Sequence, residues 1–412
     1  MTTLHEHSTT SRHRTLRLLA VATSAVLVTA SATVTAVAAP AATTTVGSWG
    51  PGVNAGGPGF TNQTIRQVVH VSAGGTAPRL RLSNLHGTTP LTIGHVDLAT
   101  QATAGTATTG THHQVTFAGS TSATIQPGRE QLSDPVSMTV NTNQNLLVSV
   151  YVPGTTGAST WHPSSADTTY VSTTGDHATD DSTSRYPSTK NSWHFLSGLE
   201  VTSTTATGTL VAFGDSITDG LKSSKGTNRR YPDYLARRLA TVIGGPQLGV
   251  VNAGISGNRV LTDAGSTNGN SALHRFAHDA LAQPNVKDVI LLEGINDITT
   301  NSTLTAKQLT DAYQTLITQA HQAGVAVYGG TITPFGHFSG YTTGRENIRQ
   351  AVNKWIRTSG TFDGVADFDA AIRDPAETTR ILPTYDSGDH LHPGDRGYQA
   401  MANAVNLAAL RY

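Results

Sequence analysis

Residues 211–220 read VAFGDSITDG, an apolar run that ends in Gly214, Asp215 and Ser216 and then becomes polar. Gly, Asp and Ser are common turn residues, and they end many buried strands that take no part in catalysis. Loops that a rigid sheet holds in place are also where catalytic side chains are found. Ser216 is therefore either a turn residue or a nucleophile, and the rest of the chain bears on the choice.

From Thr202 onward, apolar runs alternate with helical patterns. The apolar runs are 209–216, 249–258, 287–297, 324–335 and 362–372, and the helical stretches are 231–243, 272–282, 304–322, 342–358 and 394–411. Nearly continuous apolar strands that alternate with helices are typical of a parallel sheet covered on both faces. We therefore predict a parallel α/β domain over residues 204–412.

The preceding part of the chain, residues 46–203, is rich in Thr, Ser and Gly. Short alternating segments separated by turn residues occur at 67–72, 80–85, 91–99, 113–119, 136–140 and 145–152. Alternation with a period of two predicts antiparallel strands, and we expect an accessory domain that is a β-sandwich or jelly roll. Its tryptophans Trp49, Trp161 and Trp193 either form a sugar-stacking surface or pack in the interior, and we favour packing.

Residues 1–41 have the order of a secretory signal peptide. Arginines at positions 12, 14 and 17 precede an apolar run over 18–39, and small residues predict cleavage near Ala38 or Ala41. The alternative is a transmembrane anchor, because the run is about long enough to span a bilayer. Its many Ala, Thr and Ser residues favour a signal peptide, so we expect a secreted, extracellular protein with no membrane anchor after cleavage.

The composition limits the possible partners and chemistry. With 412 residues, of which 37% are hydrophobic, the chain is long enough for two packed domains. Its 27 basic and 27 acidic residues give a net charge of zero, so we expect no nucleic-acid partner. The absence of cysteine excludes disulfides, thiol nucleophiles and zinc–thiolate sites.

Four polar clusters follow apolar runs in the predicted parallel domain. Ser216 follows the first run, and the clusters 252–258 and 294–297 follow the second and third. The fourth cluster, 389–392, lies in the loop before the last helix. Sites in such sheets form at the carboxyl ends of the strands, so turns alone are a poor explanation of all four clusters.

A serine nucleophile needs a base that an acidic group orients. His392 supplies an imidazole, and Asp389 precedes it by three residues, which gives a triad in the order Ser, Asp, His. Two alternatives stay open on spacing alone. His390 with Asp386 forms a second pair of this kind, and His390 with His392 could bind a metal ion as an HxH pair if a third ligand were present.

Acyl transfer also needs hydrogen-bond donors for the oxyanion. The sequence NAGISGN at 252–258 offers the backbone of Gly254 or Gly257, and Asn296 offers a side-chain amide. Tight turns and a capping Asn explain each of these residues equally well when it is taken alone. Their shared place at the ends of strands, together with Ser216, favours a role in catalysis.

Together these motifs resemble the SGNH hydrolases, also called GDSL esterases. GDSITDG around Ser216, NAGISGN around Gly257, GIND around Asn296 and DHLHP around His392 match the four blocks of that family, in order, over about half the chain. The resemblance implies a three-layer α/β/α sandwich with a parallel sheet of five strands. It also implies Ser216 as nucleophile, His392 as base and Asp389 as its orienting partner. The oxyanion hole would consist of the Ser216 and Gly257 N–H groups and the Asn296 amide.

The resemblance also bears on substrate and partners. Members of this family are esterases, lipases, thioesterases and carbohydrate deacetylases, and the long β-rich extension resembles exported bacterial members related to an esterase encoded among xylan-degrading enzymes. We expect a monomeric serine esterase, without metal or organic cofactor, that removes acetyl or short acyl groups from plant polysaccharides or small esters. The alternatives are a lipase or lysophospholipase that acts on lipid esters, and a carbohydrate-binding protein whose hydrolase domain is inactive.

Overall fold

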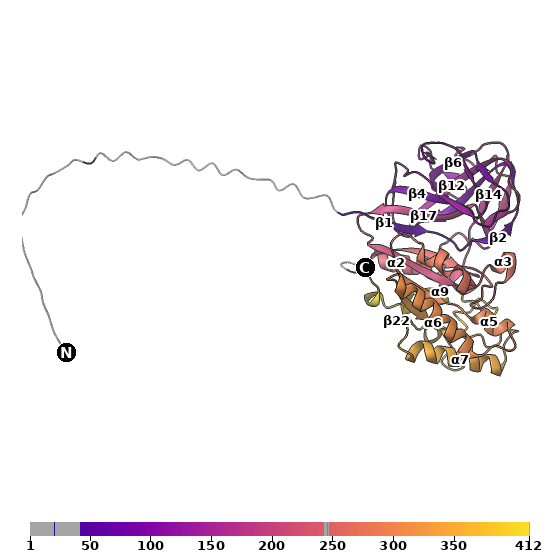
Figure 1. Ribbon diagram of the computed structural model, residues 1–412, viewed down its shortest axis with the longest axis vertical. Coiled ribbons are helices and arrows are strands. Elements are labelled where there is room, and N and C mark those ends of the chain that lie inside the picture. Colours follow the sequence, from indigo (N-terminus) through magenta and orange to yellow (C-terminus); the bar gives the residue numbers. More distant parts are fainter. Residues whose placement is uncertain (1–19, 21–41, 243–244, 246, 412) are drawn as a thin grey trace, which may run out of the picture. The chain divides into compact units, whose positions relative to one another are not determined.

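The computed structural model describes residues 20, 42–242, 245 and 247–411 (Figure 1). The described residues from Ala42 onward form one compact unit. The predicted signal peptide, residues 1–41, lies outside the described residues except for position 20. None of the helices in the described part of the chain is both long and apolar enough to cross a bilayer.

The C-terminal half contains the predicted parallel sheet of five strands. Its order is β19 (Leu248–Gly254), β18 (Gly208–Gly214), β20 (Val286–Leu292), β21 (Ala326–Gly330) and β22 (Gly364–Ala366). All seven residues of the central strand β18 are buried, so both faces of the sheet are covered there. The prediction of a parallel α/β domain is confirmed.

The helices of this domain fall into two groups, and the helices within each group contact one another. In one, α2 (Tyr231–Ala240) and α8 (Phe368–Ile372) both contact α9 (Asp395–Ala404). The other consists of α4 (Ala272–Phe276), α5 (Ile295–Thr300), α6 (Ala306–Gln322) and α7 (Thr343–Thr358). The remaining short elements are α1 (Ser216–Asp219), α3 (Gly265–Asn268), the π-helix η1 (Ala277–Leu281) and the 3-10 turn η2 (Leu407–Ala409).

Two of the differences between the predicted elements and the structure lie near the C-terminus. The apolar run 362–372 predicts one strand, but β22 covers only three residues of it, and helix α8 follows because the Asp367 side chain caps the helix by accepting a hydrogen bond from Ala370 N. The last helix ends at Ala404, since Val405 is extended and Asn406 caps the separate turn η2.

The N-terminal half is an antiparallel β-rich region, as predicted. Its five-stranded sheet has the order β1 (Thr44–Trp49), β17 (Leu196–Ser203), β4 (Gly75–Asn84) and β10 (Arg129–Leu132), with β11 (Thr139–Val140) also paired to β4. Its seven-stranded sheet has the order β15 (Ser188–Lys190), β14 (Thr169–Thr174), β3 (Thr61–His70), β12 (Asn145–Thr155), β6 (His95–Thr103) and β7 (Thr106–Ala107), with β8 (His113–Val115) paired to β6. Two small sheets consist of β16 (Trp193–His194), β13 (Ser159–His162) and β2 (Asn54–Gly57), and of β5 (Leu91–Ile93) and β9 (Ala123–Ile125).

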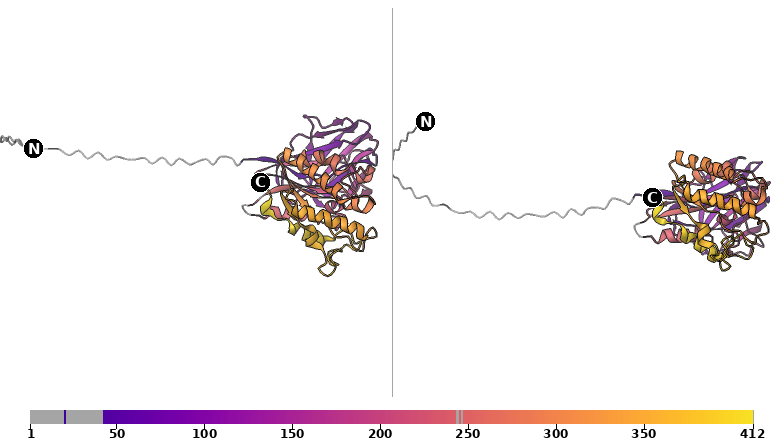
Figure 2. Two further views of the ribbon diagram at one scale, coloured as in Figure 1. Left: turned by 60° about the horizontal axis from the view of Figure 1, so that its bottom comes forward. Right: turned by 90° about the horizontal axis from the view of Figure 1, so that it is seen from below.

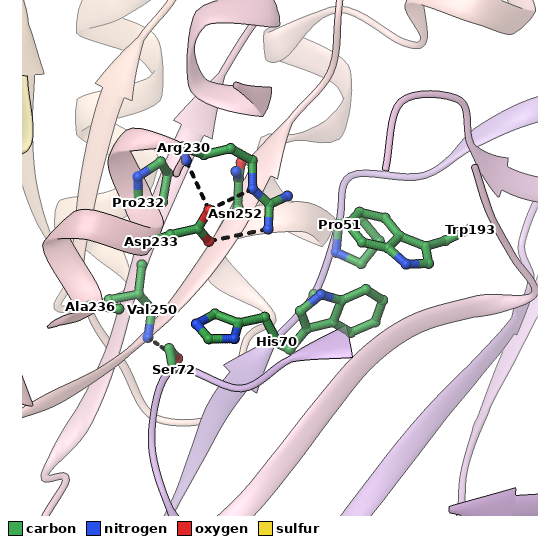
Figure 3. A pocket seen from close by; sticks show the side chains of 12 residues that line it. Pro51, His70, Ser72, Trp193, Arg230, Pro232, Asp233, Ala236, Val250 and Asn252 are labelled. Atoms are coloured by element: carbon green, nitrogen blue, oxygen red, sulfur yellow. Dashed lines mark hydrogen bonds and ion pairs between the residues drawn. The ribbon is translucent and has the colours of Figure 1, made fainter. Parts of the chain in front are cut away.

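The β-rich region packs directly on the parallel domain (Figure 1, Figure 2). Strand β1 contacts β18 and β19, and Gly47 N donates a hydrogen bond to Thr209 Oγ1 over 2.8 Å. Figure 3 shows another part of this contact, where His70 and Trp193 of the β-rich region lie opposite the Arg230–Asp233 ion pair. The buried hydrogen bonds from Gly47 N to Thr209 Oγ1 and from Val250 N to Ser72 Oγ join the two halves directly.

The tryptophans considered for sugar stacking are largely used for packing. Trp49 and Trp193 are 5% and 3% exposed, and their rings meet edge to face at 5.0 Å. The half-buried Trp161 donates a hydrogen bond to Ala55 O and stacks on His194. Their positions agree with the favoured packing role.

Candidate active site

Ser216 is the first residue of α1, directly beyond the carboxyl end of β18. The Asp215 side chain caps α1 by accepting a hydrogen bond from Ile217 N at 2.9 Å. Glycine is needed at position 214, because a Cβ there would lie 2.2 Å from Thr218 Oγ1 and 2.3 Å from Leu292 O. The tight connection places Ser216 at the sheet edge with 4% of its surface exposed.

The loop before α9 brings a histidine and an aspartate to Ser216. Ser216 Oγ lies 2.8 Å from His392 Nε2, and His392 Nδ1 lies 2.9 Å from Asp389 Oδ2. Partial burial raises the pKa of Asp389, but hydrogen bonds from the backbone and side chain of His392 outweigh it and lower the pKa to about 2. Asp389 is therefore ionised at neutral pH and favours a proton on His392 Nδ1.

The alternative base forms a separate pair. His390 Nδ1 lies 2.7 Å from Asp386 Oδ2, and the His390 side chain is 48% exposed. The hydrogen-bond partner of Ser216 Oγ is His392 Nε2 instead. The HxH hypothesis needs a third ligand, and within the described ranges no group of three or more His, Asp or Glu side chains is arranged to hold a metal ion.

Two of the candidate oxyanion donors lie in the segments that follow β19 and β20, the strands that flank β18. Gly257 follows β19 with φ +77°, and a Cβ there would lie 1.7 Å from Asn268 Nδ2. Asn296 follows β20 and donates from Nδ2 to Asn258 O at 2.9 Å, which joins the two loops. Gly254 still belongs to β19, where a Cβ would lie 2.2 Å from Asp219 N, so its role is close packing against α1.

Arg275 is a buried residue that the sequence motifs did not include, and its hydrogen bonds connect the segments around the site. Its guanidinium donates to Gly214 O at 2.8 Å, to Ala253 O at 2.7 Å and to Asn258 Oδ1 at 2.9 Å. The one available signal was the Arg275–Asp279 pair, four residues apart on a helix face that is otherwise apolar.

Asp215, Glu293 and Asp297 are three buried acidic side chains close enough to interact with one another. Burial raises the pKa of Asp215 to about 7, and it raises the pKa of Glu293 and of Asp297 above their ordinary values. Repulsion from nearby carboxylates raises the pKa values of Asp215 and Glu293 further. Asp215 thus shapes the turn by capping α1, while its protonation adds a pH dependence to stability.

We expect Asp215→Asn to flatten the pH dependence of unfolding. Folded Asp215 holds its proton up to about pH 7, whereas the unfolded side chain loses it near 3.8, so wild-type stability falls as pH rises through this window. Asparagine retains the oxygen that caps α1 but has no proton to lose. Melting temperatures measured from pH 4 to 8 should therefore fall less in the variant.

The matched control is Asp311→Asn, because the Asp311 side chain is 57% exposed in an ion pair with Lys307. It should keep the wild-type slope. Equal slopes in Asp215→Asn and the wild type would contradict the assignment of a raised pKa to Asp215.

One known family matches part of this chain. Residues 212–400 match the GDSL-like Lipase/Acylhydrolase family, a stretch that contains all five candidate residues. A search of curated proteins gave no match.

Solved structures give three examples of similar chains. A protein of the G-D-S-L family from Desulfitobacterium hafniense DCB-2 is 21% identical and covers 48% of this chain and 96% of its own, with a TM-score of 0.37. The acetylxylan esterase Axe2 from Geobacillus stearothermophilus is 22% identical, with 48% and 92% coverage and a TM-score of 0.37. The carbohydrate acetylesterase Est24 from Sinorhizobium meliloti is 16% identical, with 48% and 95% coverage and a TM-score of 0.38.

Proposed function

Because residues 212–400 belong to the GDSL-like lipase/acylhydrolase family and the protein is a carboxylic ester hydrolase, we propose that it cleaves esters with Ser216 as nucleophile. His392 is the base and Asp389 its orienting carboxylate. The observation that carries the proposal is the continuous chain of hydrogen bonds from Asp389 through His392 to Ser216, at 2.9 and 2.8 Å. This is the arrangement that nucleophile activation requires.

In the proposed mechanism, His392 Nε2 takes the proton of Ser216 Oγ as the oxygen attacks the ester carbon. Ionised Asp389 stabilises the imidazolium that forms. His392 then gives the proton to the departing alcohol, which leaves an acyl group on Ser216. Water attacks this acyl-enzyme with His392 again as base, and the acid is released.

The oxyanion of each tetrahedral intermediate would accept hydrogen bonds from three groups. As the first residue of α1, Ser216 has a backbone N–H without a partner inside the helix. Gly257 offers a second N–H, and Asn296 has one amide hydrogen left after its bond to Asn258 O. Such donors act where negative charge develops, so they lower the barrier rather than strengthen substrate binding.

We propose acetyl or short acyl esters of plant polysaccharides, or small esters, as substrates. Among the described residues, the one large hydrophobic side chain that is exposed is Val365, at 36%. A surface of this kind offers no apolar patch for docking on a lipid aggregate, which supports a short-acyl substrate over a lipid.

A chain-length series tests the choice of substrate. We expect kcat/KM for p-nitrophenyl esters to fall by about tenfold or more from acetyl to decanoyl, because a small acyl site excludes added methylenes. The protein should also release acetate from acetylated xylan, pectin or mannan. A rise toward decanoyl, together with hydrolysis of a lysophospholipid, would support the lipid alternative instead.

We further propose that the protein is exported, acts as a monomer, and has an accessory β-sandwich at residues 46–203. The sequence of residues 1–41 supports export. The two large antiparallel sheets support the sandwich, since Leu80 and Val201 of one share a single hydrophobic core with Ile65 and Val148 of the other. The proposed boundary falls between β17 and β18, which end and begin at Ser203 and Gly208.

A further inference from the structure

His162, the last residue of β13, reaches from the β-rich region to the active-site turn. Its Nδ1 lies 2.7 Å from Gly52 O, and its Nε2 lies 2.9 Å from Ser164 O and 3.1 Å from Asp219 Oδ1. All three atoms are acceptors, so both ring nitrogens must donate and the ring is an imidazolium. Burial lowers the pKa of His162, but the Asp219 carboxylate more than compensates and the pKa is raised.

Asp219 connects this cation to the oxyanion loop, which we define as residues 256–258. Asp219 is the last residue of α1, three residues after Ser216, and its side chain is 2% exposed. Its Oδ2 accepts a hydrogen bond from Ser256 Oγ at 2.6 Å. Ser256 precedes Gly257, so the position of one proposed oxyanion donor depends on a side chain of the β-rich region.

A second chain of contacts reaches the other side of Gly257. Glu130 of β10 lies 3.2 Å from His278 Nε2, and His278 Nδ1 lies 2.7 Å from Asp279. Hydrogen bonds to these two carboxylates raise the pKa of His278 to about 10. Asp279 holds Arg275 at 2.9 Å, and Arg275 Nε donates to Asn258 Oδ1.

We propose that His162 is a positioning residue for ester hydrolysis, which with Asp219 holds the oxyanion loop while Glu130 supports the loop from the opposite side. The proposal rests on the proposed function, because it takes Gly257 as an oxyanion donor. The β-rich region is then part of the catalytic unit. A buried ion pair is weak evidence of added stability, so the role that we assign to His162 and Asp219 is to fix geometry.

The first test replaces His162 by leucine and by glutamine. Leucine removes both donors, and we expect kcat to fall about 10- to 100-fold with KM within about twofold, since a misplaced oxyanion donor acts on the transition state. Glutamine keeps one donor and should recover part of kcat. Rates are expressed per site titrated with a fluorophosphonate, so unfolded molecules do not contribute.

The matched control is Thr209→Val, which breaks the hydrogen bond from Gly47 at the amino end of β18. This contact between the two halves lies about 20 Å from Ser216 at ~3.3 Å per strand residue. We expect a lower melting temperature with kcat per titrated site unchanged. A similar loss of kcat in Thr209→Val would show that any weakening of the contact lowers activity and would overturn the role of His162.

A double-mutant cycle tests the path through Asp219. Ser256→Ala removes the other end of that path, so His162→Gln combined with Ser256→Ala should be no slower than the slower single variant. Effects that multiply, or full kcat in His162→Leu, would overturn the inference. Ser216→Ala is measured in parallel to distinguish failure of the role of His162 from failure of the proposed function. Activity in Ser216→Ala would overturn the proposed function itself.

Discussion

Ser216→Ala is expected to abolish ester hydrolysis, lowering kcat for p-nitrophenyl acetate by about 10⁴-fold or more. The hydroxyl is the proposed attacking atom, and it lies 2.8 Å from the nitrogen that would take its proton. Without it, the remaining groups can only assist direct attack by water. The melting temperature should change little, because the substitution removes one oxygen from a small side chain.

Ser224→Ala is the control for this experiment. Ser224 is exposed in the loop that follows α1 and lies outside the proposed site, so the variant should keep wild-type kcat. Full activity in Ser216→Ala would contradict the mechanism, whatever the substrate proves to be.

His392→Gln is expected to lower kcat by about 10⁴-fold, whereas His390→Gln should stay within about threefold of the wild type. The two histidines occupy the same loop, and each lies within 3 Å of an aspartate, at 2.9 and 2.7 Å. They differ in that His392 also contacts Ser216. Comparing the two variants therefore distinguishes loss of the base from destabilisation of the loop as the cause of a lower kcat.

The outcome is read as kcat at a pH where the wild type is fully active, together with melting temperatures for both variants. Loss of activity in His390→Gln with activity kept in His392→Gln would reverse the assignment. If both variants lost kcat and melting temperature equally, activity would depend on the stability of the loop and not on one of the two histidines as base.

The parallel sheet could be predicted because its strands are buried on both faces. Such strands give continuous apolar runs, as β18 and β20 do, and the helices between them carry clear amphipathic patterns. The short strand β22 was less predictable, because the same apolar run continues into α8 and only the cap at Asp367 separates the two.

The choice between His390 and His392 could not be made from spacing. Asp386 and Asp389 stand at short and similar distances in sequence from these two histidines, and the structure contains both aspartate–histidine pairs. Which histidine faces Ser216 depends on the path of the loop, in which His390 has a positive φ of 65°. The path of the loop depends on tertiary structure. The family resemblance indicated His392 only by analogy.

The contribution of the β-rich region to the site had no local signal at all. His162 and Asp219 are 57 residues apart and belong to different halves of the chain. A lone histidine in an alternating strand pattern gives no indication of a distant carboxylate. Only the packing of the β-rich region on the parallel domain brings the two side chains together.

Mapping the site of covalent modification tests the role of Ser216 most directly. After reaction with a fluorophosphonate, peptide mass spectrometry should find one adduct, on Ser216, with its formation matching the loss of activity. In His392→Gln the adduct should form much more slowly, because the base that activates Ser216 is absent. Inactivation with an adduct on another residue, or without any adduct on Ser216, would contradict the account.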